Sequence, residues 1–421
     1  MKLLFVSSLY PPNLVGGAEL SLRALAQALA AEGDDVHVAT LAPPDAALVS
    51  IERDRGVTVH RFALANLYWP WGDRGKQTLL KKSVWHAVDS ANTVMARRLA
   101  ALVARIQPDA VITNNLQGWS TAVVPTAKRL GVPVVHVLHD YSLLCPQTTM
   151  YRGGSGCGTG DERCGRCRLL TRPRHTHMRD VDAVIGVSQS ILEFHHMHGL
   201  FREVQRTVIH NPLKDGIDIR RSPRPRTNGP VRFGYLGRLE SMKGIETLLR
   251  AADYLARDDL LFEVLVAGTP STPTYLDSLK SRWPLRNVHY LGFVNDPVRF
   301  LDSIDCLVFP TDWLEALGNG VFEAFARGIP VIGSDAGGIP ETISHGTDGF
   351  IFQRGQWRDL ADRMRLLAVD AELRESLGSA ALAKAPGYLA TLRAGEYRRF
   401  LRKVAAAKTE HVGVEPQSCG R

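Results

Sequence analysis

The chain has 421 residues, too many for one hydrophobic core of ordinary size, so we expect two domains. Its composition is 45% hydrophobic and 22% charged, as in globular proteins, and the sequence has no apolar run of the roughly 20 residues that cross a bilayer. A net charge of +8 suits phosphate-bearing partners without choosing among nucleotide, nucleic acid and anionic membrane. The opening MKLLFVSSLYPP is too short for a signal peptide, so we expect a buried first strand and a cytoplasmic protein.

Strands and helices alternate through the first half of the chain. Apolar runs predict strands at residues 2–9, 35–42, 57–64, 109–115, 133–140 and 182–191, and helical spacing predicts helices at 15–33, 75–106 and 120–131. This alternation is typical of a doubly wound parallel sheet. We therefore expect an α/β domain over residues 1–219.

A break follows at RRSPRPRTNGP, residues 220–230, where three prolines and a glycine exclude a helix or a central strand. We predict that this is a linker to a second α/β domain over 231–386. Strands are expected at 231–239, 262–268, 288–294, 305–311 and 329–335, and helices at 244–255, 274–283, 296–304, 319–328 and 360–385. A last helix at 387–408 is expected to pack back on the first domain, ahead of a disordered tail, 409–421.

The turn PPNLVGGAEL, residues 11–20, joins the first strand to the first helix. Gly16 and Gly17 lie where unpaired helix amides favour an anion. A tight turn without a ligand is the alternative. The pattern differs from G-x-G-x-x-G, so it does not support a nicotinamide enzyme.

Two cations surround a strand-end glycine in YLGRLESMKGIETLL, residues 235–249. Arg238 and Lys243 follow Gly237 and precede a helix, where a guanidinium and an ammonium can neutralise a diphosphate. The alternative is that both are exposed side chains on a loop that binds no ligand.

Residues 309–341 contain two glutamates, Glu315 and Glu323, separated by a glycine-bearing loop. We expect Glu315 before a helix and Glu323 in its first turns, with Gly318 and Gly320 allowing close approach to a ligand. Carboxylates accept hydrogen bonds from sugar hydroxyls. The apolar neighbours of Glu323 indicate burial, so this carboxylate needs a partner.

These motifs together resemble the family 4 glycosyltransferases, from Met1 to about residue 382. The resemblance rests on the GGAE turn, Gly-Arg…Lys-Gly at 237–244, Glu-x7-Glu at 315–323 and EAFARGIPVIGSDAGGIPE. It implies a GT-B fold with two Rossmann-like domains facing across a cleft. It also implies retaining transfer of a sugar from a nucleotide donor with no cofactor required for catalysis. Asn319 and Gly320 depart from the apolar residues that many members have between the glutamates.

The resemblance also assigns residue roles. Arg238 and Lys243 would hold the donor diphosphate, Glu323 the ribose and Glu315 the transferred sugar. His139, after a strand in HVLHDYSLLCP, would lie beside that sugar. The implied donor-binding set is Gly16, Gly17, Gly237, Arg238, Lys243, Glu315, Leu317, Gly318 and Glu323, and the implied catalytic set is His139, Arg238, Lys243 and Glu315.

The predicted reaction uses a nucleotide diphosphate sugar, with UDP favoured over GDP, and a hydroxyl of a glycan, a lipid-linked saccharide or a small molecule. Nucleic acid is not an expected partner. Two alternatives remain open: a GT-B epimerase or phosphorylase, and a non-catalytic nucleotide-sugar-binding protein.

Four cysteines fall within a short, glycine-rich stretch: Cys145, Cys157, Cys164 and Cys167. In a cytoplasmic protein such a cluster favours a metal over disulfides, and four thiolates would suit a structural zinc ion. Reduced thiols and a disulfide are the alternatives.

Two basic stretches of the first domain mix cations with apolar residues. GKQTLLKKSVWHAV carries Lys76, Lys81 and Lys82 among Leu79, Leu80, Val84 and Trp85, and RCRLLTRPRHTHMRD spans residues 166–180. Such a surface could contact anionic lipid headgroups at the inner membrane face. A solvated face is the alternative.

Overall fold

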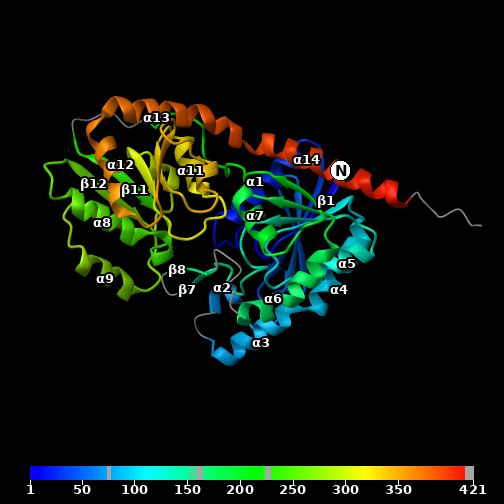
Figure 1. Ribbon diagram of the computed structural model, residues 1–421. Helices are drawn as coiled ribbons and strands as arrows, with labels where there is room; N and C mark the ends of the chain where they lie inside the picture. Colours follow the sequence, from blue (N-terminus) through cyan, green and yellow to red (C-terminus); the bar gives the residue numbers. More distant parts are fainter. Residues whose placement is uncertain (74–76, 153–154, 158–164, 223–228, 413–421) are drawn as a thin grey trace, which may run out of the picture. The chain divides into compact units, whose positions relative to one another are not determined.

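The computed structural model describes residues 1–73, 77–152, 155–157, 165–222 and 229–412. The contacts divide the chain into two compact units (Figure 1). The first unit comprises Met1–Thr149, Gly160–Pro212 and the segment from Ala390, and the second comprises Met150–Thr159 and Leu213–Leu389.

The division at Pro212 comes earlier than the predicted end of the first domain at residue 219. The reason is that the predicted linker begins inside the second unit. The amides of Arg220 and Ser222 donate hydrogen bonds to the carbonyl oxygens of Ala326 and Arg327, at 3.0 and 2.9 Å. Residues 223–228 of the predicted linker lie outside the described residues.

The first unit is built on an eight-stranded sheet of order β10-β9-β6-β5-β1-β2-β4-β3. Only the edge strand β3 pairs antiparallel. The strands are β1 (Lys2–Val6), β2 (Asp35–Ala42), β3 (Val49–Asp54), β4 (Val57–Ala63), β5 (Ala110–Thr113), β6 (Val134–Leu138), β9 (Ala183–Gly186) and β10 (Gln205–Val208). Leu3–Val6 of β1 are fully buried, as expected for a parallel strand covered on both faces.

Helices flank this sheet (Figure 1). They are α1 (Gly17–Ala31), α2 (Pro70–Asp73), α3 (Leu79–Ser90), α4 (Thr93–Ile106), α5 (Val123–Arg129), α6 (Gly165–His177), η2 (Met178–Asp180), α7 (Gln189–Met197) and α14 (Ala390–Val412). The final helix α14 packs against α1, where Arg398 forms ion pairs with Glu32 and Asp34 at 2.6 and 2.8 Å.

The second unit has a six-stranded parallel sheet of order β13-β12-β11-β14-β15-β16. Its strands are β11 (Val231–Leu236), β12 (Phe262–Ala267), β13 (Val288–Gly292), β14 (Cys306–Phe309), β15 (Val331–Ser334) and β16 (Gly349–Phe352); a small hairpin pairs β7 (Tyr151–Arg152) with β8 (Ser155–Gly156). Its helices are η3 (Ser241–Lys243), α8 (Ile245–Leu255), α9 (Pro273–Arg282), α10 (Pro297–Leu301), α11 (Asn319–Phe325), η4 (Ile339–Glu341), α12 (Trp357–Val369), α13 (Ala371–Lys384) and η5 (Ala385–Tyr388).

The two parallel α/β sheets confirm the predicted fold class, while several boundaries differ. The basic region predicted as one helix over 75–106 is two helices, since Asn92 accepts a hydrogen bond from the amide of Met95 and begins α4. Strands β3, β10 and β16 were not predicted. Helix α14 runs to Val412, past the predicted end at 408, and the remainder of the predicted tail lies outside the described residues. Among the described residues, no helix is both long and apolar enough to span a membrane.

Candidate active site

The predicted donor-binding residues of the second unit lie where neighbouring parallel strands end. Strand β14 pairs with both β11 and β15, so the loops after these strands meet at one edge of the sheet. Open α/β sheets bind ligands at this carboxyl edge. Gly237 follows β11 directly, and Glu315 lies in the loop between β14 and α11.

Lys243 and Glu315 form an ion pair across this edge. Lys243 Nζ lies 2.6 Å from Glu315 Oε2, and the two side chains are only 18% and 14% exposed. The same ammonium lies 4.6 Å from the centre of the Trp313 ring, a cation–π contact. The amide of Trp313 donates a hydrogen bond to Met242 O at 3.0 Å, so the two loops are also joined through their backbones. The sequence-predicted cation and carboxylate are thus in direct contact.

Two glycines are required by this arrangement. Gly244 begins α8 with a φ of 73°, and a Cβ atom there would lie 1.7 Å from Pro310 O. Gly337 has a φ of 62°, and its Cβ would lie 2.1 Å from Glu315 O. Both positions therefore need the left-handed backbone that glycine tolerates and the space that a missing side chain leaves. The close approaches fix the backbone on which Lys243 and Glu315 are mounted.

We predict that Gly244→Ala lowers the free energy of unfolding by about 3 kcal/mol or more, because left-handed strain adds to a backbone clash. Gly216→Ala is the matched control. Gly216 belongs to the same unit and has a φ of 83°, but a Cβ there meets nothing within 4 Å. We expect this control to cost only about 1 kcal/mol. Chemical denaturation of both variants measures the difference, and equal losses would contradict the role of the Pro310 contact.

Arg238 lies at the same edge but is more accessible. Its side chain is 57% exposed and forms an ion pair with Glu240 at 3.0 Å. Its carbonyl accepts a hydrogen bond from the Tyr235 hydroxyl at 2.8 Å, which fixes the backbone after β11. The guanidinium therefore projects from an anchored backbone and can change partner at little cost.

Glu323 is buried in α11 and has the partner that its burial requires. Lys214 Nζ lies 2.7 Å from Glu323 Oε1. Burial raises the pKa of Glu323 above its ordinary value, and the positive charge of Lys214 opposes that rise. Leu317 and Gly318 precede the helix, and Gly318 has a φ of 85° at its N-terminus. Helix α11 ends at Phe325, a turn earlier than the predicted end at Gly328.

Three residues that contact or neighbour the predicted site residues were not predicted from the sequence: Lys214, Asp312 and Trp313. Asp312 is close to Thr247, whose hydroxyl lies 3.5 Å from Asp312 Oδ2, while its buried Oδ1 has no hydrogen-bond partner among the described residues. Burial raises the pKa of Asp312. Both Asp312 and Trp313 lie within the segment 309–341 considered above, two to three residues before Glu315, and this proximity was the available signal. Lys214 gave none, because it lies far from Glu323 in sequence.

His139 lies in the first unit, just after β6. Its Nε2 is 3.1 Å from Asn114 Oδ1, at the end of the neighbouring strand β5. Burial lowers the pKa of His139 to about 4, so the imidazole is neutral at neutral pH. It can therefore form hydrogen bonds to a polar ligand without contributing a charge.

Gly16 and Gly17 lie at the N-terminus of α1, as predicted. The amide of Gly16 donates a hydrogen bond to Glu19 Oε2 at 3.0 Å. The helix thus supplies its own carboxylate to this amide, in the manner of a capping box. An incoming phosphate would compete with Glu19 for this amide.

The cysteine cluster is described only in part, because Cys164 lies outside the described residues. Cys145 is buried, and Cys167 lies in α6. Within the described part of the chain, no three His, Cys, Asp or Glu side chains are grouped so as to hold a metal ion. The described cysteines therefore do not make a site by themselves, and the four-cysteine zinc site stays a prediction.

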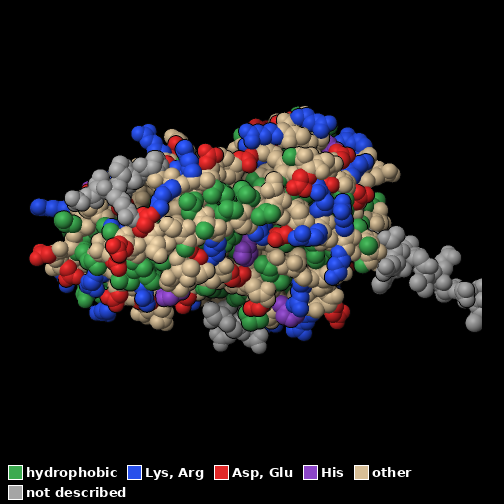
Figure 2. Space-filling view, turned by 90° about the horizontal axis from the view of Figure 1, so that it is seen from above, with side chains coloured by type: hydrophobic (Ala, Val, Ile, Leu, Met, Phe, Trp, Pro, Cys, Tyr) green, Lys and Arg blue, Asp and Glu red, His purple; other side chains and the backbone are tan. Residues whose placement is uncertain are grey.

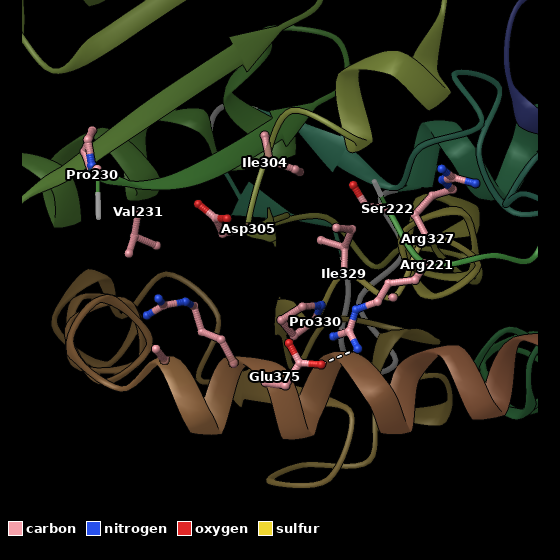
Figure 3. Close-up of a pocket in the computed structure, with 14 residues that line it drawn as sticks. Arg221, Ser222, Pro230, Val231, Ile304, Asp305, Arg327, Ile329, Pro330 and Glu375 are labelled. Carbon is pink, nitrogen blue, oxygen red and sulfur yellow. Dashed lines mark ion pairs between the residues drawn. The ribbon is translucent and has the colours of Figure 1, made fainter. Parts of the chain in front are cut away.

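A cavity of about 330 Å³ lies at the opposite edge of the second unit, near the start of β11 (Figure 3). Arg221 faces Glu375 across it in an ion pair, and Arg327 is paired with Asp302 at 2.7 Å. Its position at the amino ends of β11, β14 and β15 separates it from the carboxyl edge, where such sheets bind ligands. We therefore do not assign the donor to it.

Two family models match most of the chain. The model of glycosyl transferases group 1 matches residues 217–384, and that of a glycosyl transferase 4-like domain matches residues 16–212. The chain belongs to the group 1 glycosyltransferases. It is therefore an enzyme of the transferase class, as the sequence motifs predict.

Relatives and solved structures agree with this assignment. The glycosyltransferase is 29% identical over 343 residues to a Klebsiella pneumoniae protein named "uncharacterized 42.6 kDa protein in cps region", covering 81% of this chain and 87% of that one. It is 28% identical over 375 residues to glycogen synthase of Mycobacterium tuberculosis, covering 83% and 81%. Sucrose-phosphate synthase of Thermosynechococcus elongatus is structurally similar, with a TM-score of 0.74 and 19% identity over 97% of this chain and 100% of that one. Anabaena HepE, solved in complex with UDP, gives a TM-score of 0.69 and 20% identity over 96% and 100%. The fold is GT-B.

Proposed function

We propose that this glycosyltransferase transfers a sugar, with retention of anomeric configuration, from a UDP-sugar to a hydroxyl of a saccharide or lipid-linked saccharide. The observation that carries the proposal is the mostly buried contact between Lys243 and Glu315 at the carboxyl edge of the second sheet. A cation for a diphosphate and a carboxylate for sugar hydroxyls are the two groups that such a donor needs there.

Several relatives support the choice of donor and acceptor. The Anabaena structure was also solved in complex with UDP-glucose, with a TM-score of 0.63 to this chain. A Staphylococcus aureus relative, 31% identical over 148 residues, is a capsular polysaccharide biosynthesis glycosyltransferase, but only 35% of this chain and 39% of that one are covered. These names favour UDP over GDP and a saccharide acceptor.

In the proposed donor complex, Lys243 and Arg238 bind the diphosphate, and the amides around Leu317 and Gly318 face the donor. Glu323 accepts hydrogen bonds from the ribose and Glu315 from the transferred sugar. His139 of the first unit contributes a neutral hydrogen-bonding group toward that sugar. Gly16 and Gly17 contribute amides once the diphosphate displaces Glu19.

The proposed chemical step breaks the bond between the anomeric carbon and the β-phosphate oxygen. The acceptor oxygen bonds to that carbon on the same face, and its proton passes to the departing phosphate oxygen. The two cations stabilise the charge that develops on the diphosphate, the kind of electrostatic stabilisation that contributes most in many enzymes. No metal or other cofactor takes part in this proposal.

A thermal-shift screen of nucleotides and nucleotide sugars tests the donor. A ligand that binds only the folded protein raises its melting temperature, so UDP and UDP-sugars should raise it more than their GDP counterparts. Release of UDP that needs an acceptor indicates transfer. Conversion of the donor alone would indicate an epimerase, dependence on inorganic phosphate a phosphorylase, and binding without turnover a non-catalytic protein. The anomeric configuration of the product by NMR tests retention.

We predict that His139→Ala lowers kcat/KM by about 10- to 100-fold, through the loss of hydrogen bonding to the donor. The loss should be uniform between about pH 6 and 8, because the folded pKa of about 4 keeps the imidazole neutral over this range. A profile of kcat/KM against pH measures it. His289→Ala, at a half-exposed histidine of the second unit, is the control. A change of kcat/KM centred near pH 6.5 that the wild type shows and His139→Ala does not would contradict a neutral histidine.

The lowered pKa of His139 also makes the free energy of unfolding depend on pH. The folded pKa of His139 lies below its unfolded value of 6.5. Its contribution to stability is thus present above about pH 6.5 and is lost as the pH falls toward 4.

A structural zinc ion bound by the four cysteines remains a proposal. Elemental analysis of the purified protein, together with the thermal stability of Cys164→Ser, tests it.

A further inference from the structure

Helix α3 exposes an apolar surface that none of the described residues of the first unit covers. Leu79 and Leu80 are 82% and 75% exposed, and Val84 and Val88 continue from Leu80 at four-residue spacing along one side of the helix. Trp85, which the sequence placed on the same amphipathic surface, is instead buried and donates its Nε1 hydrogen bond to Tyr68 O at 3.0 Å. The helix is thus held by Trp85, while its leucines point to solvent.

Helix α6 lies beside α3 and adds both apolar and basic groups (Figure 1). Arg174 of α6 and Asp89 of α3 lie 3.5 Å apart and are both buried, which joins the two helices. Leu169 is 70% exposed, next to the exposed Arg168. Helix α6 contains no acidic residue, and the single one in α3 is the buried Asp89.

A basic basin lies between α6 and the end of α7. It has a volume of about 820 Å³, and its lining includes Arg168, Arg172, Arg202, His175, Leu169 and Met197. The three guanidinium groups form no ion pair with any residue that the structure describes. Elsewhere arginines such as Arg232 and Arg365 are paired with carboxylates. On the face shown in Figure 2, basic and acidic side chains likewise lie close together. Among the described residues, the basin therefore gathers unpaired positive charge beside the exposed Leu169.

We propose that α3 and this basin form a docking surface for an anionic phospholipid bilayer. The leucines of α3 and α6 would enter the headgroup–acyl boundary, and the arginines of the basin would bind lipid phosphates. Protruding apolar groups combined with basic ones are the features of interfacial membrane binding. This surface specifies a membrane contact that the sequence left open beside a solvated face, and it does not depend on the proposed donor chemistry.

Two features favour a lipid surface over a nucleic acid. Single-stranded nucleic acids are bound through aromatic side chains on which bases stack, and the exposed apolar side chains here are aliphatic. A phosphate backbone alone would also give no reason to expose Leu79, Leu80 and Leu169. The combination fits a partner that presents anions over a hydrocarbon layer.

Sedimentation of the full-length protein with phospholipid vesicles tests the proposal. Vesicles of phosphatidylcholine alone are compared with vesicles containing about one third phosphatidylglycerol, at low and high salt. The basin variant is Arg168→Gln/Arg172→Gln/Arg202→Gln. Its charge-matched control is Arg286→Gln/Arg299→Gln/Arg402→Gln, which removes three exposed arginines that likewise form no ion pair with described residues. The apolar variant is Leu79→Gln/Leu80→Gln, with Leu261→Gln, at a 73% exposed leucine of the second unit, as its control.

The wild type and both controls should bind the anionic vesicles in a salt-sensitive manner and bind the neutral ones weakly. The basin variant should bind on the order of 100-fold more weakly, and the apolar variant about 10-fold more weakly. Equal binding to both vesicle types, or equal losses in a variant and its control, would overturn the proposal. Binding of a short RNA without binding of vesicles would overturn it too. The vesicle assay contains no donor. If UDP raises the melting temperature of both variants as it does that of the wild type, a loss of vesicle binding is not caused by a loss of donor binding.

Discussion

Replacing Lys243 by alanine is expected to lower kcat/KM by about 10²- to 10³-fold, the usual effect of removing one electrostatic stabiliser of a transition state. The ammonium is mostly buried between Glu315 and Trp313. Its loss removes a charge that the departing diphosphate needs and leaves the Glu315 carboxylate without its partner. Steady-state kinetics with a UDP-sugar, together with calorimetric titration of UDP, measure the two effects separately.

Lys280→Ala is the matched control for this experiment. Lys280 is an exposed lysine of the same unit, and its ammonium lies 5.6 Å from the centre of the Tyr290 ring, so it too makes a cation–π contact. We expect its removal to leave activity unchanged. Lys243→Arg keeps the charge and should recover part of the lost activity. If Lys243→Ala folds normally and transfers sugar at the wild-type rate, Lys243 does not bind the diphosphate.

The second large effect is expected at Lys214. The substitution Lys214→Met removes the charge that opposes the burial-raised pKa of Glu323. That pKa should rise further, so that a larger fraction of Glu323 is protonated at a given pH and cannot accept two hydrogen bonds. UDP affinity should therefore fall about 10-fold, and the loss should become smaller as the pH rises. Calorimetric titration of UDP across a range of pH measures it.

The stability of Lys214→Met should also depend on pH. A carboxyl whose folded pKa lies above its unfolded value contributes stability below the unfolded value, and this is lost as pH rises through the folded value. The deficit of the variant relative to wild type should therefore grow toward alkaline pH, to about 3 kcal/mol for a buried charge that has lost its partner. Glu323→Gln in the same background should abolish the pH dependence. If the loss in free energy of unfolding stays constant with pH, it comes from the packing of the Lys214 side chain and not from its charge.

The residues that sequence analysis located best are those beside a strand end. Glu315 was expected in a loop and Glu323 in the following helix, and both are found there, because an apolar run followed by glycines fixes the strand and the turn. The need for a partner of Glu323 was also predicted from its apolar neighbours. Lys214 could not be identified as that partner, since it belongs to an irregular segment that only the folded chain brings to α11.

Other differences have equally local causes. The side of α3 that Trp85 occupies depends on contact with Tyr68, which the spacing of apolar residues does not report. The break between α3 and α4 is set by a single capping interaction of Asn92. Strands β10 and β16 lie at the edges of their sheets. The segment of β10, Gln205–Val208, contains a single apolar residue, so no apolar run marks it as a strand.

The course of the chain between its two units limits how the enzyme can be divided. Helix α14 follows the second unit in sequence but packs against α1, and Arg398 is paired with Glu32 and Asp34. A fragment ending at Leu389 would therefore expose the surface of α1 that α14 covers and leave Asp34 without Arg398. The continuous part of the second unit would begin at Leu213 and lack the hairpin β7–β8, which comes from earlier in the chain. Neither half of this transferase is a continuous stretch of polypeptide, so exchanging domains between relatives requires three segments for the first unit and two for the second.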